Sequence, residues 1–133
     1  MQYGRFRPEN IMNLDISASS IGELLEHEFE QRKIPTALPT AADWGYTFRV
    51  RIGKQFIDIS VVGQDEDGYG IALELRKDIL NAFFGYDQKK AIETAKSILS
   101  EALSTMVADF TLTWYSKSEW LATFDTDFWE EQN

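Results

Sequence analysis

The chain has 133 residues, 44% hydrophobic and 14% aromatic, which predicts one compact domain spanning residues 1–133. Its 22 acidic and 13 basic residues give a formal net charge of −9, which disfavours nucleic acid and favours basic protein surfaces as partners. The absence of cysteine excludes disulfides, zinc thiolates, iron–sulfur clusters and thiol catalysis. No apolar run follows the first arginines and no segment has bilayer-spanning length, so we expect a cytoplasmic protein that binds no membrane.

A first helix is predicted from Ile21 to Lys33. Apolar residues recur there at helical spacing, and Ser20 and Glu23 have the spacing of a capping box. Pro35 forbids continuation of the helix, and the mixture of proline, alanine and threonine around and after it indicates a surface connection. Before the helix, residues 11–16 alternate apolar and polar side chains, which is typical of a short strand or an extended arm.

Alternating apolar residues next predict an antiparallel hairpin around the two-residue turn Gly53-Lys54. The turn places Arg49 across from Asp58 on the solvent face, a favourable pair that a one-residue slip would separate. On the other face, the same register sets Val50 opposite Ile57, Phe48 opposite Ile59 and Tyr46 opposite Val61.

A third strand follows, with Ile71, Leu73 and Leu75 pointing inward. One allowed pairing of this strand places Arg76 opposite Asp58, so that the carboxylate would lie between two arginines.

The second half of the chain predicts a long helix, a strand and a short helix. The apolar stripe from Ala91 to Met106 marks the long helix, which Asp87 can cap. Residues 110–115 alternate as a strand, and Ser116 with Glu119 makes a second capping box. The fold class is therefore α+β: a two-layer domain in which an antiparallel β-meander plus a further strand is covered by a long helix, with flanking N- and C-terminal helices.

The acidic stretch GQDEDGYGI, residues 63–71, has to be weighed as a calcium loop or as a turn. In a calcium loop starting at Asp65, Tyr69 replaces a ligand and Arg76 stands where the bidentate glutamate belongs. Aspartate and glycine are ordinary turn formers. We therefore predict a mobile, metal-free hairpin loop between the second and third strands.

Catalytic motifs are missing from the chain. His27 is the only histidine, and its position among glutamates predicts a solvated side chain on a helix face. The sequence contains no nucleophile elbow, phosphate-binding glycine loop or dinucleotide fingerprint. Paired carboxylates could still form a hydrolytic site in space. We expect no enzyme activity, no catalytic residue, no cofactor and no bound metal.

The C-terminal segment FDTDFWEEQN mixes aromatic and acidic residues. It can be a docked terminal helix or an acidic-aromatic contact arm. Docking is the favoured interpretation, because three large exposed aromatic side chains would promote aggregation.

The run ADWGYTFRVRIGKQFIDISVV, followed by GYGIALEL, an FFG element, a long helix and the strand FTLTWYS, resembles small bacterial proteins of unknown function. These proteins share an aspartate-tryptophan-glycine-aromatic strand start, and some act as immunity proteins against toxins. The resemblance covers Asp43 to Trp114 and implies no functional residue. The element order and acidity are also similar to class I type III secretion chaperones, which usually have a further strand before the last helix that is not evident here.

These observations predict a non-catalytic, acidic protein-binding module, such as an immunity-type inhibitor of a basic partner protein. The alternatives are a type III secretion chaperone-like protein and an enzyme with an unrecognised carboxylate site. A homodimer is left open. The candidate partner contacts come from the first helix, the acidic loop and the C-terminal segment: Glu23, Glu26, Glu30, Asp65, Glu66, Asp67, Asp125, Asp127, Trp129 and Glu130.

Overall fold

The computed structural model describes residues 2–8, 17–65, 68–76, 85–107 and 109–124. The described chain belongs to the α+β class, as predicted. Its elements are, in order, β1 (Gln2–Pro8), α1 (Ala18–Gln31), β2 (Thr36–Ala42), β3 (Gly45–Ile52), β4 (Gln55–Asp65), β5 (Gly68–Leu75), α2 (Gly85–Met106), β6 (Phe110–Tyr115) and α3 (Lys117–Phe124).

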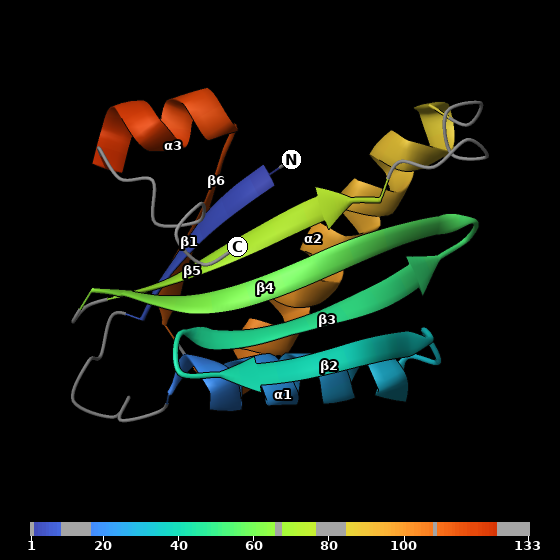
Figure 1. Cartoon of the computed structure of the whole chain (residues 1–133), viewed down its shortest axis with the longest axis horizontal. Helices are drawn as coiled ribbons and strands as arrows, with labels where there is room; N and C mark the ends of the chain where they lie inside the picture. Colours follow the sequence, from blue (N-terminus) through green and yellow to red (C-terminus); the bar gives the residue numbers. More distant parts are fainter. Residues whose placement is uncertain (1, 9–16, 66–67, 77–84, 108, 125–133) are drawn as a thin grey trace.

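The strands form one antiparallel sheet in the order β2-β3-β4-β5-β1-β6 (Figure 1). Helices α1 and α2 lie side by side on one face of this sheet, over the main hydrophobic core. Helix α3 packs on the opposite face, where Trp120 is buried against Tyr3, Val62 and Ala72. None of the described helices is long and apolar enough to cross a membrane.

The β3–β4 hairpin has the predicted register. Val50 lies opposite Ile57, and Arg49 lies opposite Asp58. Gly53 takes the left-handed conformation, with φ of 63°, that the first turn position of such a two-residue hairpin requires. The Arg49 Nε donates to Asp58 Oδ1 at 2.7 Å, so the cross-strand ion pair is confirmed.

The register of β4 with β5 differs from the prediction. Asp58 lies opposite Glu74, not opposite Arg76. The long arginine side chain still reaches back diagonally, and its Nε lies 3.7 Å from Asp58 Oδ2. The prediction that the Asp58 carboxylate lies between Arg49 and Arg76 is therefore confirmed, but the predicted pairing of Arg76 directly opposite Asp58 is wrong.

The acidic stretch at 63–71 is mostly strand. β4 continues to Asp65 and β5 begins at Gly68, and these two residues are paired across the hairpin. Glu66 and Asp67 lie outside the described residues. The prediction of a loop is wrong for the ends of this stretch, because glycines and aspartates that favour turns are also tolerated where two strands meet at a short connection. Within the described ranges, no group of three or more His, Cys, Asp or Glu side chains could hold a metal ion.

Two strands occupy positions where no strand was predicted. β2 replaces the predicted surface connection, and it pairs with β3 although it contains Pro39. The strand tolerates proline because it is a sheet edge and because its register shifts between Ala37 and Thr40. β1 comes from the first residues of the chain, while the predicted strand or arm at 11–16 lies outside the described residues.

The helix boundaries correct two predicted caps. Ser17, not Ser20, is the N-cap of α1, and its side chain accepts a hydrogen bond from the Ser20 amide at 3.1 Å. The predicted capping box of Ser20 and Glu23 is therefore wrong, because the helix begins about one turn earlier in the chain. α2 begins at Gly85, so Asp87 lies within the helix instead of capping it.

The capping box of α3 is confirmed. The Ser116 amide donates to Glu119 Oε1 at 2.8 Å, and the Glu119 amide donates to Ser116 Oγ at 3.2 Å. The hydrogen bonds from Ser116 hold the pKa of the Glu119 carboxyl below its usual value.

Among the described residues, Gln55 is a polar side chain that is buried without hydrogen bonds. It faces inward in register with Ile57 and is fully buried, and within the described part of the chain neither its Nε2 nor its Oε1 has a hydrogen-bond partner. A desolvated amide that makes no hydrogen bond costs free energy.

Gln55→Met is expected to stabilise the protein, because methionine has a similar volume and no polar group to desolvate. The free energy of unfolding should rise by roughly 1–2 kcal/mol in urea titrations. Gln31→Met, at an exposed position of α1, is the control and should change it by less than about 0.5 kcal/mol. A loss of stability in Gln55→Met would mean that the amide is hydrated in solution.

Candidate functional site

The outward side of α1 carries an open, shallow depression of about 470 Å³. The helix packs Ile21, Leu25 and Phe29 on the core, so its 3.6-residue period turns the remaining positions toward solvent. We call this surface the α1 face. It consists of Ser20, Glu23, Leu24, Glu26, His27 and Glu30.

Two of its three carboxylates are oriented by the sheet. The Tyr46 hydroxyl on β3 donates to Glu26 Oε1 at 2.5 Å. The Thr36 hydroxyl on β2 donates to Glu30 Oε1 at 2.9 Å. Because the two donors belong to strands of the sheet, their hydrogen bonds restrict the rotamers of the Glu26 and Glu30 side chains, which would otherwise be free to move.

The ionisation of Tyr46 reflects first its burial and then the negative charges of this face. Burial raises the pKa of the phenol, and the hydrogen bond to Glu26 raises it further. The negative charges of Glu26, Glu23 and Glu30 act in the same direction. Tyr46 therefore remains a protonated donor at physiological pH.

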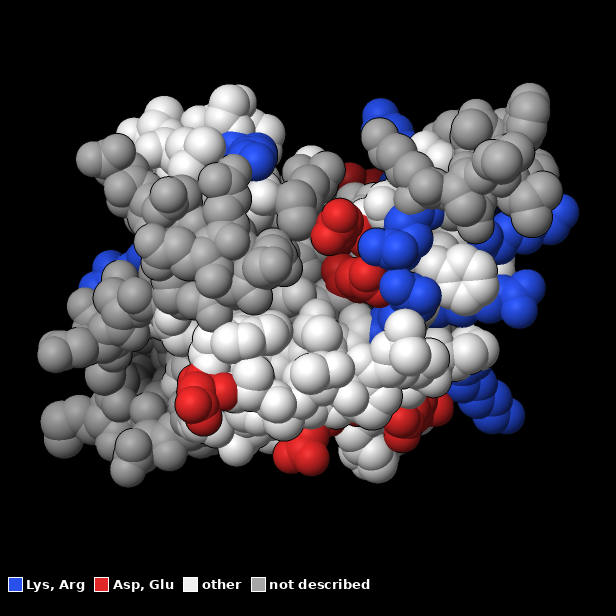
Figure 2. Space-filling model, in the orientation of Figure 1, with Lys and Arg blue, Asp and Glu red and all other residues white. Residues whose placement is uncertain are grey.

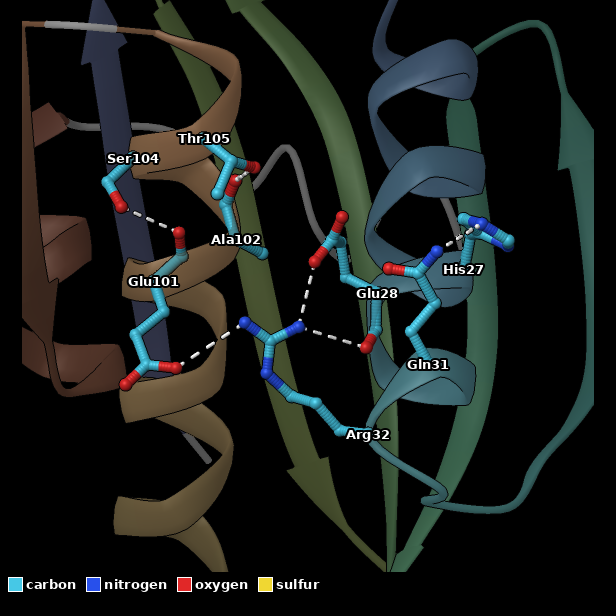
Figure 3. Close-up of polar contacts among 8 residues, drawn as sticks. All are labelled: His27, Glu28, Gln31, Arg32, Glu101, Ala102, Ser104 and Thr105. Carbon is cyan, nitrogen blue, oxygen red and sulfur yellow. Dashed lines mark hydrogen bonds and ion pairs between the residues drawn. The ribbon is translucent and has the colours of Figure 1, made fainter.

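An apolar side chain lies within the same depression. Leu24 is 44% exposed, one of the most exposed large hydrophobic residues among those described. Beside it, His27 is exposed, as predicted, and its Nε2 lies 3.0 Å from Gln31 Nε2 (Figure 3). The α1 face thus combines acidic groups with an accessible leucine.

A separate polar contact joins α1 to α2. The Arg32 Nη1 donates to Glu28 Oε2 at 2.8 Å and to the Glu28 carbonyl at 3.0 Å, while Nη2 lies 3.4 Å from Glu101 Oε2 (Figure 3). The hydrogen bond that the guanidinium donates to the Glu28 carboxylate is the largest cause of a raised Arg32 pKa. Glu28 is therefore neutralised locally and differs from the three carboxylates of the α1 face.

The opposite face of the sheet is not uniformly acidic. Figure 2 shows blue and red atoms close together on the side away from α1 and α2. Arg49 and Arg76 flank Asp58 there, and the Arg51 guanidinium lies 5.9 Å from the centre of the Phe56 ring. Charges of both signs partly cancel on this face, in contrast to the α1 face.

The structure brings together three of the ten predicted contacts, Glu23, Glu26 and Glu30. Asp65 is the last residue of β4. The residues that sequence analysis missed are Leu24 and the two orienting donors from the sheet. The other predicted contacts lie outside the described residues, namely Glu66, Asp67, Asp125, Asp127, Trp129 and Glu130.

Comparison of the chain with protein-family models, with curated proteins and with solved structures gave no match.

Proposed function

We propose that the protein is a non-catalytic binding module that docks a basic surface of another protein on the α1 face. The observation that carries this proposal is the grouping of Glu23, Glu26 and Glu30 beside the exposed Leu24 in one depression. Protein interfaces commonly combine an apolar anchor with a polar rim. A partner with Lys or Arg side chains around an apolar group is complementary to this arrangement.

Electrostatics supports the same assignment. The formal charge of −9 should accelerate encounter with a cationic partner and make that rate fall with salt. The hydrogen bonds to Glu26 and Glu30 reduce the side-chain entropy that binding would otherwise cost.

The shape of the α1 face favours binding over catalysis. Its histidine and carboxylates lie on the outside of a single helix, around an open depression. Acid–base catalysis by such groups gains most where the site excludes water and shifts their pKa values. A shallow acidic surface serves protein recognition more directly.

Two kinds of partner fit this module. An immunity-type inhibitor would block a basic toxin in a stoichiometric complex, which the strand pattern from Asp43 to Trp114 suggests. A secretion chaperone-like protein would instead hold an extended segment of a secreted protein. The stoichiometry of the complex and the folded state of the bound partner distinguish the two.

The direct experiment is capture of partners by the tagged protein from its native cells at low salt, followed by mass spectrometry. Binding of a captured partner is then compared for Glu23→Lys and Glu74→Lys. Both changes alter the charge by the same amount, but Glu74 is exposed on the opposite face of the sheet. We expect Glu23→Lys to weaken binding by roughly threefold to tenfold, and Glu74→Lys by much less.

Added salt should weaken binding as Glu23→Lys does, since both reduce the electrostatic attraction between the α1 face and a basic partner. Equal weakening by the two variants would assign the effect to net charge alone. Binding that is insensitive to salt and to Glu23→Lys would contradict the proposal.

A further inference from the structure

β6 forms one edge of the sheet, and among the described strands only β1 pairs with it. An edge strand has a row of backbone N–H and C=O groups that the sheet itself does not satisfy. Proteins generally protect such edges, because they readily accept a strand from another chain.

The two edges of this sheet differ in that protection. On β2, Pro39 lacks an N–H, Leu38 has a φ of 54°, and the register shifts between Ala37 and Thr40. Each of these features disrupts a regular hydrogen-bonding edge. β6, with the sequence FTLTWY, contains no proline, glycine or charged residue and consists largely of residues that favour strands.

Two large side chains of β6 lie over the sheet and not over the outer backbone edge of their own strand. Trp114 lies over Gly4 of β1, where an added Cβ would come within 2.7 Å of the indole ring. Leu112 is opposite Phe6 and packs on the main core. Both large side chains are therefore directed over the sheet and do not cover the outer edge of their own strand.

We propose that β6 pairs antiparallel with β6 of a second copy of this chain, about a twofold axis through Thr113. Residues directly opposite each other in an antiparallel pair point to the same face, so the pairing would continue the sheet and its helix-covered face across both copies.

This register is self-complementary. It sets Leu112 opposite Trp114 of the second copy on the helix-covered face. On the other face it sets Thr111 opposite Tyr115 of the second copy, and the two Thr113 side chains adjoin at the axis. Apolar groups thus meet apolar groups, and hydroxyls meet hydroxyls.

Charge favours the antiparallel arrangement of two identical copies. Asp109 precedes β6 and Lys117 follows it. Antiparallel pairing places the end of one strand that Asp109 precedes beside the end of the other that Lys117 follows, whereas parallel pairing would place ends of like charge together. Helix α1 packs on β2, β3 and β4, away from β6, so the acidic α1 faces of the two copies stay out of the contact.

Disulfide trapping tests the register, because the natural chain has no cysteine. Thr113→Cys places the only thiol at the proposed axis, where opposed Cβ atoms would lie about 4.5–5.5 Å apart, close enough for cross-linking with little adjustment. We expect mild oxidation to convert most of this variant to a covalent dimer. Thr111→Cys is the matched control, since its two copies would be separated by four residues, or about 14 Å, and should not cross-link.

The mass of the wild-type protein in solution is the independent readout. A six-residue strand contact is small, so we expect the dimer mass to predominate only at high concentration, about 0.5 mM. Thr113→Asp opposes two carboxylates at the axis and should remain monomeric there with an unchanged circular dichroism spectrum. A monomeric wild-type protein at this concentration overturns the proposal, as does preferential cross-linking of Thr111→Cys or of Thr40→Cys on β2.

Discussion

Phe29→Ala is expected to lower the free energy of unfolding by about 3–5 kcal/mol. Phe29 is fully buried at the junction of α1 with the sheet, and its ring meets that of Phe48 edge to face with centroids 5.9 Å apart. Alanine would remove these contacts and leave a cavity that packed strands can fill only in part.

Urea unfolding followed by tryptophan fluorescence measures the loss. Leu24→Ala is the control on the same helix, because its side chain is already 44% exposed and should cost less than about 1 kcal/mol. Similar losses in the two variants would show that α1 is not anchored through Phe29.

Gly22→Ala is expected to destabilise the protein by about 1–3 kcal/mol, although alanine normally stabilises a helix interior relative to glycine. An added Cβ at Gly22 would lie 2.4 Å from the Cβ of Tyr46 and 2.8 Å from its Cγ. Helix α1 or strand β3 would have to move, because the clash involves the base of the side chain and not a flexible end.

The same displacement would separate the Tyr46 hydroxyl from Glu26, so partner binding should weaken together with stability. Thermal unfolding and a binding titration measure the two effects. Ser97→Ala, at an exposed position inside α2, is the control and should leave stability unchanged or slightly higher. A more stable Gly22→Ala protein would rule out the close approach of α1 to β3.

Sequence periodicity was sufficient to predict the secondary structure and strand register where the contacts are between residues close in the chain. The β3–β4 hairpin follows from alternation and from a turn that admits Gly53, and both determine its register. β1 is different, because its pairing with β5 and β6 joins segments far apart in the chain and depends on long-range packing. β2 was missed because proline is a poor strand residue except at an edge or bulge, and edge position is a property of the whole sheet.

For the candidate site too, the part that depends on one helix could be predicted from the sequence, and the part that depends on tertiary packing could not. The spacing of Glu23, Glu26 and Glu30 brings them to one side of a helix whatever the tertiary structure. The donors from Thr36 and Tyr46 depend on how α1 sits on β2 and β3, which no local pattern encodes. Leu24 fits the apolar spacing of the helix, so only its exposure in the folded protein shows that it belongs to the surface.

The central claim is that the α1 face contacts the partner, and backbone amide NMR of the labelled protein tests it most directly. The captured partner is titrated at low salt, and the perturbed amide resonances are mapped on the fold. The account predicts that the largest changes fall between Ser20 and Glu30, with smaller changes at Thr36 and Tyr46, and that added salt reverses them. Changes confined to the arginine-bearing face around Arg49 and Arg76, with α1 unperturbed, would contradict it.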